Sequence, residues 1–180
     1  NSIFISSTGY ISRELYELRE LNNQRHASDF LTVGSMGHSS QIALGISLAK
    51  KEVTVICLDG DGAMIMHMGG LVTCGINGQK NFLHILLNNS VHDSVGGQPT
   101  SGFKIAPTQI SNGCQYKYNY GPCDNESDIK KAISNLKDFG GPAFLEIRIK
   151  PGARKNLGRP KESPIYNKNI FIKNLNEISE

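Results

Sequence analysis

The chain has 180 residues, of which 38% are hydrophobic and 19 are glycine. This length and apolar content fit one globular domain with a real core and fall short of what two domains usually need. The formal charge of +3, from 19 basic and 16 acidic residues, is too small an asymmetry to indicate a nucleic-acid partner. No apolar run approaches the roughly 20 residues that span a bilayer, and no secretion signal opens the chain, so we expect a soluble protein with no membrane partner.

The cysteines indicate a cytoplasmic protein. Cys57, Cys74, Cys114 and Cys123 form no CxxC pair and no metal-finger spacing. Cys57 and Cys74 fall in strongly apolar segments, where a thiol behaves as a small hydrophobe. The sequence opens at Asn1 without a methionine and enters an apolar run at once, as expected of the back part of a longer chain.

Apolar runs of strand length alternate with amphipathic segments of helix length. Buried strands are predicted where Val, Ile, Leu and Phe dominate on both faces, at 3–6, 30–33, 53–58, 82–87 and 143–149. Helices are predicted at 12–21, 39–50, 63–75 and 127–138. Crossovers of this length indicate an α/β fold with a mostly parallel sheet, helices on both faces and ligands at the carboxyl ends of the strands.

The composition changes to Gly, Pro, Lys and Arg after Pro151. We therefore divide the chain into a domain over 1–150 and a basic extension over 151–180 that packs on the same domain. A short helix at 170–178 is predicted within the extension, because Phe171, Leu175 and Ile178 fall on one face at helical spacing.

The most informative stretch is the predicted strand 53–58, followed by Gly60-Asp61-Gly62 and a predicted helix. Glycines let the backbone come close to a ligand, and the start of a helix attracts phosphate. Asp61 adds a carboxylate at the same place. Alone, the triplet fits a tight turn with a capping aspartate equally well.

A second strand, 82–87, ends in Asn88-Asn89. The residues between Gly62 and Asn88 suffice for one helix and one returning strand, so both strand ends are expected side by side. Mg²⁺ prefers oxygen ligands and takes few of them from protein. Asp61, the amide oxygen of Asn89 and the backbone carbonyl of Val91 would supply three ligands, and phosphate oxygens and water the remainder.

The combination of GDG, about twenty-five residues and then NN resembles the thiamine-diphosphate-dependent enzyme family. The resemblance implies thiamine diphosphate and Mg²⁺ as cofactors, with Asn89 as the metal ligand and Asn88 as a structural or diphosphate-contacting residue. It also implies a cofactor site over the turn that starts the helix. That turn comprises Gly60, Asp61, Gly62 and Ala63.

A second segment, Gly34-Ser35-Met36-Gly37-His38, supports the resemblance. The family grips the pyrimidine of its cofactor with a similar segment between a strand and a helix. By this resemblance the Gly34 carbonyl accepts a hydrogen bond from the aminopyrimidine, Met36 wedges the bent conformer, and Ser35 and His38 lie beside the cofactor. Ordinary core packing is the alternative for Met36.

Two short stretches complete the predicted site. Thr8 and Gly9, at the end of the first predicted strand, match a family position that borders the pyrimidine. His92 and Asp93 lie directly beyond the metal loop, where a proton donor would help catalysis. They are the catalytic candidates together with Met36, and a purely structural role for His92 is the alternative.

The string HDSVGGQPT at 92–100 resembles the phosphonopyruvate decarboxylase branch of the family, as do 34–38, 67–69 and 156–160. The implied activity is non-oxidative decarboxylation of 3-phosphonopyruvate, a small anionic 2-oxo acid, to phosphonoacetaldehyde and CO₂. Sulfopyruvate decarboxylase, whose corresponding half is a separate beta-type subunit, and an acetolactate-synthase-like carboligase are alternatives. A nucleotide-binding or regulatory protein that shares only the sheet is the alternative from another class.

Two features concern what the chain binds. Arg154, Lys155 and Arg159 are candidates for binding the phosphonate, with a solvated tail as the alternative. Family members activate the pyrimidine through a glutamate of a separate pyrimidine-binding domain, and no acidic residue of this sequence occupies such a motif. The resemblance therefore implies that this domain comes from an upstream segment or a partner chain, within a homo- or hetero-oligomer.

Overall fold

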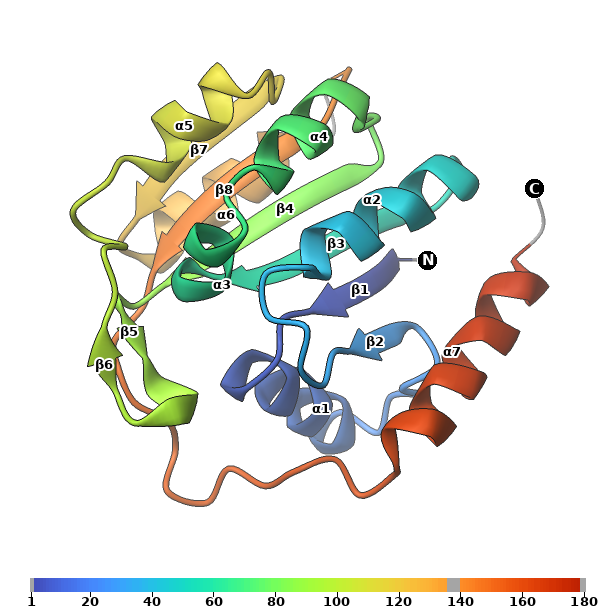
Figure 1. The fold of residues 1–180 in the computed structure, drawn as a ribbon. Coiled ribbons are helices and arrows are strands. Elements are labelled where there is room, and N and C mark those ends of the chain that lie inside the picture. Colours follow the sequence, from blue (N-terminus) through green and yellow to red (C-terminus); the bar gives the residue numbers. More distant parts are fainter. Residues whose placement is uncertain (1, 136–139, 179–180) are drawn as a thin grey trace.

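The computed structural model describes residues 2–135 and 140–178. Its centre is a six-stranded sheet in the order β2-β1-β3-β4-β8-β7, in which every neighbouring pair is parallel (Figure 1). The strands are β1 (Ser2–Ser6), β2 (Asp29–Leu31), β3 (Thr54–Gly60), β4 (Phe82–Asn88), β7 (Tyr118–Cys123) and β8 (Ala143–Arg148). The predicted α/β fold with a mostly parallel sheet is confirmed.

Helices cover both faces of this sheet (Figure 1). One face carries α2 (Ser39–Ala49), α4 (Gly70–Asn77) and α5 (Pro107–Gly113). The other carries α1 (Tyr10–Leu21) and α6 (Glu126–Asn135). Shorter elements follow the carboxyl ends of β3 and β4: α3 (Asp61–Met66), β5 (Val91–His92), the 3-10 helix η1 (Asp93–Val95) and β6 (Gln98–Pro99).

Side chains alternate across the sheet and form a core on each face. The larger core lies beneath α2 and α4 and includes Ile3, Ile5, Val55, Cys57, Phe82, Leu86 and Phe144. The opposite face packs Ile85 and Leu145 against Ala132 of α6, and Leu15 and Tyr16 of α1 against Leu31. Both cores hold the strands rigidly, so the loops at their carboxyl ends start from fixed positions.

The winding direction of the chain changes between β1 and β3. β1 pairs with both β2 and β3. The crossover from β1 to β2 runs through α1 on one face, whereas the crossover from β2 to β3 runs through α2 on the other. The loops that leave the carboxyl ends of β1 and β3 therefore diverge, and α/β sheets bind ligands in the crevice that such a divergence opens.

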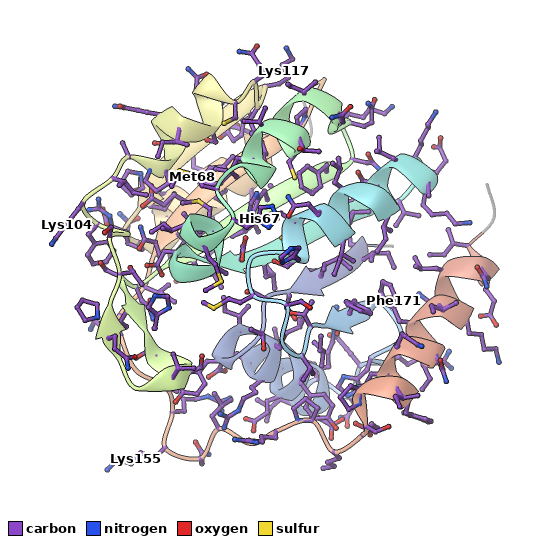
Figure 2. The ribbon with its side chains drawn as sticks, viewed as in Figure 1. His67, Met68, Lys104, Lys117, Lys155 and Phe171 are labelled. Carbon is purple, nitrogen blue, oxygen red and sulfur yellow. The ribbon has the colours of Figure 1, made fainter. Side chains whose placement is uncertain are left out.

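The chain returns along α1 after the sheet is complete. Residues 150–163, here named the strap, run beside α1 to α7 (Pro164–Glu177) (Figure 1). Arg13 of α1 donates to the carbonyls of Leu157 and Gly158. In α7, Phe171 is buried and packs on Phe30 of β2 with ring centroids 5.3 Å apart (Figure 2).

Several predicted boundaries are corrected. The segment 63–75, predicted as one helix, forms α3 and α4 with a break at 67–69. Gly69 and Gly70 stand at that break, and glycine is a poor helix former. The closing helix begins at Pro164 instead of residue 170, because the Ser163 hydroxyl accepts the Tyr166 N–H and caps it.

Three further differences concern the remaining elements. The strand predicted at 30–33 is β2, which ends at Leu31 before a loop of positive φ that starts at Gly34. α5 and β7 were not predicted. The helix predicted at 127–138 is described as α6 only to Asn135, and 136–139 lie outside the described residues. Within the described part of the chain, every helix is too short or too polar to cross a bilayer.

Candidate active site

A cavity of about 470 Å³ opens between β1 and β3 at the carboxyl edge of the sheet. Its volume lies within the range of about 300–1,000 Å³ that small-molecule sites occupy. Most of the predicted site residues line it: Thr8, Met36, Gly60, Asp61, Gly62, Ala63, Asn89, Val91, His92 and Asp93. Gly9, Gly34, Ser35 and His38 are not among the lining residues.

Asp61 and Asn89 both line this cavity, just beyond the carboxyl ends of the adjacent strands β3 and β4. The register of β3 and β4 pairs Gly60 with Leu87, so the residues that follow the two strands are neighbours. Asp61 is only 2% exposed and accepts a hydrogen bond from the Thr100 hydroxyl. The Asn89 amide oxygen accepts the Val91 N–H at 3.1 Å. A carboxylate and an amide oxygen, the ligand types that Mg²⁺ prefers, thus border one space.

The loop after β6 closes over Asp61, which sequence analysis did not foresee. The Thr100 hydroxyl contacts Asp61 and also accepts the Gly102 N–H at 3.0 Å. A Cβ at Gly102 would lie 2.5 Å from Oδ2 of Asp61 and would also collide with Asn88. Only glycine lets the backbone pass so close. The string at 92–100 resembled a family branch but gave no signal for either residue's contacts.

Asn88 points into the protein. Its amide donates to the Gly102 carbonyl at 3.0 Å and to Oε1 of Glu146 at 2.9 Å, and its oxygen accepts the Ser90 N–H at 3.2 Å. The side chain is fully buried. This geometry favours Asn89 over Asn88 as the metal ligand.

Glu146 makes stability depend on pH. Burial raises the pKa of the Glu146 carboxyl, and the hydrogen bond from Asn88 opposes this only in part. The Glu146 carboxyl therefore keeps its proton to a higher pH in the folded state than in the unfolded chain. Its contribution to the free energy of unfolding is complete below the ordinary carboxyl pKa of about 4.3 and is lost as pH rises through the raised pKa of the folded state. We expect Glu146→Gln, which keeps an oxygen for Asn88, to flatten this dependence.

The measurement is urea denaturation between about pH 4 and about pH 8. Glu126→Gln is the matched control, because Glu126 is an exposed carboxylate that pairs with Lys130. We expect the control to leave the pH profile unchanged. A Glu146→Gln protein whose stability declines with pH as steeply as that of the unmodified protein would contradict the prediction.

The predicted pyrimidine segment is a left-handed loop that packs on α3. Gly34, Ser35 and Gly37 have φ of 73°, 48° and 88°. A Cβ at Gly37 would lie 2.9 Å from the Ala63 carbonyl oxygen, so the loop sits directly on the first turn of α3. This path brings Met36 to the cavity wall and outside the core clusters, which disfavours the core-packing alternative.

His92 and Asp93 have different surroundings although they are adjacent. The His92 ring lies against Gly62, where a Cβ would approach its Nδ1 to 2.6 Å. Asp93 uses Oδ2 to accept the Asn89 amide N–H at 2.7 Å and the Gly152 N–H at 2.8 Å. His92 therefore lines the cavity beside Gly62, whereas Asp93 holds Asn89 and Gly152 in place.

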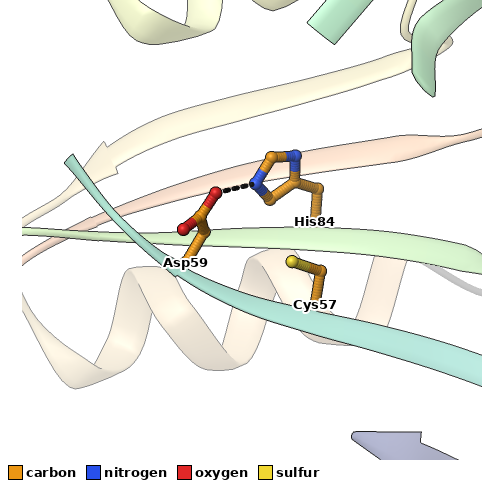
Figure 3. Close-up of side chains that lie close together, drawn as sticks. All are labelled: Cys57, Asp59 and His84. Carbon is orange, nitrogen blue, oxygen red and sulfur yellow. Dashed lines mark hydrogen bonds and ion pairs between the residues drawn. The ribbon is translucent and has the colours of Figure 1, made fainter. Parts of the chain in front are cut away.

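A buried polar chain supports the turn at Gly60, and Figure 3 shows the contact between its members Asp59 and His84. Oδ1 of Asp59 accepts the Gly60 N–H at 2.9 Å, and Oδ2 lies 3.3 Å from Nε2 of His84. Nδ1 of His84 lies 3.0 Å from the Tyr116 hydroxyl. The two ring nitrogens of His84 thus contact the Tyr116 hydroxyl and the Asp59 carboxylate. His84 is therefore structural and orients Gly60 through Asp59.

The other predicted contacts near the cavity are engaged elsewhere. The rings of His38 and His67 meet edge to face with centroids 4.5 Å apart, and His67 lies between α2 and α3 (Figure 2). Arg154 pairs with Glu14 at 2.9 Å and Glu17 at 2.6 Å. It remains solvent-exposed while it makes these two ion pairs. Lys155 projects outward from the strap (Figure 2).

The sequence from the loop after β1 to β8 matches a known family. The model for the C-terminal TPP binding domain of thiamine pyrophosphate enzymes matches residues 7–147. The chain belongs to this thiamine pyrophosphate enzyme family. The resemblance predicted from GDG and NN is confirmed, and thiamine diphosphate is the cofactor of this domain.

Relatives place the chain among the decarboxylases of the family. Phosphonopyruvate decarboxylase of Streptomyces viridochromogenes is 34% identical over 160 residues, which are 89% of this chain and 38% of the relative. Sulfopyruvate decarboxylase subunit beta of Methanococcus maripaludis is 34% identical over 151 residues, which are 84% of this chain and 77% of the relative. The chain thus spans well under half of the first relative and most of the second.

A solved structure shares the fold. The thiamine diphosphate-dependent 4-hydroxybenzoylformate decarboxylase of Rhodococcus jostii RHA1 superposes with a TM-score of 0.65 at 19% identity. The superposition covers 84% of this chain and 30% of that one.

The residues present fit thiamine diphosphate and Mg²⁺. The cavity is lined by Asp61 and Asn89, whose carboxylate and amide oxygens are ligand types that Mg²⁺ accepts. The rest of the wall is largely apolar and suits an aromatic ring. That part comprises Ile11, Leu15, Leu18, Met36, Leu58, Leu87 and Ile149.

Proposed function

We propose that this chain supplies the Mg²⁺- and diphosphate-binding half of the active site of a decarboxylase that converts 3-phosphonopyruvate to phosphonoacetaldehyde and CO₂. The observation that carries the proposal is that Asp61 and Asn89 line one cavity, beyond the ends of adjacent strands, in a chain of the thiamine pyrophosphate enzyme family. The 34% identity to phosphonopyruvate decarboxylase across 89% of this chain supports the substrate.

The chain's own residues bind and orient the cofactor. Asp61, the Asn89 amide oxygen and the Val91 carbonyl would hold Mg²⁺ in the cavity that Gly60 and Gly62 also line. Met36, which also lines the cavity, would support the pyrimidine and thiazolium rings in their bent arrangement. Thiamine diphosphate itself supplies the nucleophilic carbon and the electron sink for the loss of CO₂.

His92 is the proposed proton donor. Its ring lines the cavity against Gly62, and a ring nitrogen there would deliver a proton to the substrate carbon that has lost CO₂.

Sulfopyruvate decarboxylation is the second candidate, favoured by the match to most of the Methanococcus maripaludis subunit beta. The two substrates differ in the charge of one terminal group, a phosphonate or a sulfonate. This group needs a binding partner other than Arg154, which Glu14 and Glu17 already hold.

The test compares both substrates with the complete enzyme, in which this chain acts together with a pyrimidine-binding domain. We expect kcat/KM for 3-phosphonopyruvate to exceed that for sulfopyruvate by at least about tenfold, which corresponds to about 1.4 kcal/mol of transition-state binding. Released aldehyde is measured with a coupled dehydrogenase, and the products are identified by mass spectrometry. A reversed preference would support the second candidate. A carbon–carbon condensation product, or no turnover of either acid, would reject both.

The pyrimidine-binding domain is also part of the proposal. The relatives from Methanothermobacter thermautotrophicus and Methanococcus maripaludis are beta subunits. We propose that an upstream segment or a separate chain provides that domain here, in a homo- or hetero-oligomer.

A further inference from the structure

We infer that Asp93 is a positioning residue that fixes the Asn89 amide for metal binding and joins it to the strap. The inference rests on the proposed function, because it concerns the same metal site. Oδ2 of Asp93 accepts both the Asn89 side-chain N–H at 2.7 Å and the Gly152 backbone N–H at 2.8 Å. Asp93 thereby links the loop after β4 to a segment that lies far away in the sequence.

The first half of the argument concerns the orientation of the amide. An asparagine amide carries an oxygen and an NH₂ group of nearly equal size, and only the oxygen binds a cation. A carboxylate accepts hydrogen bonds, so Asp93 selects the NH₂ end of Asn89. The opposite end then carries the oxygen, which accepts the Val91 N–H at 3.1 Å. Without Asp93, a half-turn of the amide would place NH₂ where the metal ligand belongs.

The second half concerns the wall of the cavity. Gly152 and Ala153, at the start of the strap, line the cavity. Gly152 has φ of 99°, a conformation that glycine adopts at little cost, and its N–H points to Asp93. Arg154, two residues further on, is bound to Glu14 and Glu17 of α1. Asp93 is thus the contact that holds this wall to the metal loop.

A positioning role and an acid–base role for Asp93 predict different effects of two substitutions. Asp93→Asn keeps an oxygen that can accept both hydrogen bonds, but it cannot take up or deliver a proton as a carboxyl group does. Asp93→Ala removes both abilities. A positioning role therefore predicts that asparagine rescues what alanine loses, whereas an acid–base role predicts that both variants fail alike.

The experiment uses the complete enzyme and measures the Mg²⁺ concentration that half-saturates thiamine diphosphate binding, by calorimetric titration. We expect Asp93→Ala to raise this concentration by at least about tenfold, as the loss of a residue that orients a metal ligand typically does, and Asp93→Asn to stay within about threefold. Trypsin cleavage after Arg154 and Lys155, identified by mass spectrometry, should be faster in the alanine variant only.

The matched control is Asp128→Ala. Asp128, in α6, accepts an exposed hydrogen bond from the Asn125 amide at 2.8 Å. The substitution therefore removes the same kind of contact at a place away from the cavity. We expect it to change neither readout.

An unchanged half-saturating Mg²⁺ concentration in Asp93→Ala would overturn the inference, as would an asparagine variant as impaired as the alanine one. Loss of turnover in both variants at unchanged Mg²⁺ affinity would assign Asp93 to acid–base catalysis instead. If the unmodified enzyme binds thiamine diphosphate with an affinity that does not depend on Mg²⁺, the proposed metal site is rejected, and the inference with it. The proteolysis result separates failure of the inference about Asp93 from failure of the proposed metal site, because the contact between Asp93 and Gly152 needs neither substrate nor metal.

Discussion

Asp61→Ala is expected to abolish magnesium-dependent binding of thiamine diphosphate and to leave the domain folded. Asp61 is the one carboxylate in the proposed ligand set, since Asn89 and Val91 offer neutral oxygens. A dication loses its only charged protein ligand in this variant, so we expect its affinity to fall by at least about a hundredfold. The fold should survive, because Asp61 contributes its Thr100 contact at the edge of the sheet and no part of either core.

A pair of asparagine variants makes this test sharper. Asp61→Asn keeps the size of the side chain and an oxygen that can accept from Thr100, so a loss of Mg²⁺ affinity in it reports the charge alone. Asp124→Asn, at an exposed position after β7, is the matched control. Affinity is measured by titrating Mg²⁺ at fixed thiamine diphosphate, and folding by circular dichroism. Unchanged magnesium dependence in Asp61→Ala would remove Asp61 from the metal site.

The fold could be predicted where hydrophobic runs were long and continuous. Helices bury β3 and β4 on both faces, so the sequences of these strands are mostly apolar. Such runs can be recognised as buried strands from the sequence. β7 lies at the edge of the sheet, pairs only with β8, and contains Gly121-Pro122, where the register shifts. An edge strand tolerates proline and polar residues, so its sequence resembles a turn. Edge position, which is a tertiary property, explains why it was missed.

Spacing could predict that Asp61 and Asn89, the proposed metal ligands, lie at one edge of the sheet, but not which residues contact them. Asp61 and Asn89 follow consecutive strands, and parallel strand ends share one edge, so spacing alone placed them together. Thr100 and Gly152 reach the same edge from a hairpin and from the strap. No local sequence pattern predicts which distant residues such segments contact in the folded chain. The neighbours His92 and Asp93 look equivalent in sequence, and only their contacts separate a cavity-lining ring from a carboxylate held by Asn89 and Gly152.

The surface around the cavity supports a divided active site. Leu18 lines the cavity yet is 53% exposed. Exposed apolar side chains of this size commonly mark protein contacts. The proposed pyrimidine-activating glutamate lies on another domain, so a working site requires that domain to meet this cavity.

We therefore expect this chain, purified alone, to release no aldehyde from 3-phosphonopyruvate or sulfopyruvate. Addition of the pyrimidine-binding domain should restore turnover and produce a symmetric assembly with at least two copies of each half, because closed symmetry satisfies the same contact on every copy. The measurements are aldehyde release with and without that domain, and mass in solution by sedimentation. A chain that carries Asp61→Asn is the matched control, since it should assemble without restoring turnover. Full activity from the isolated monomeric chain would refute the divided site, whichever acid proves to be the substrate.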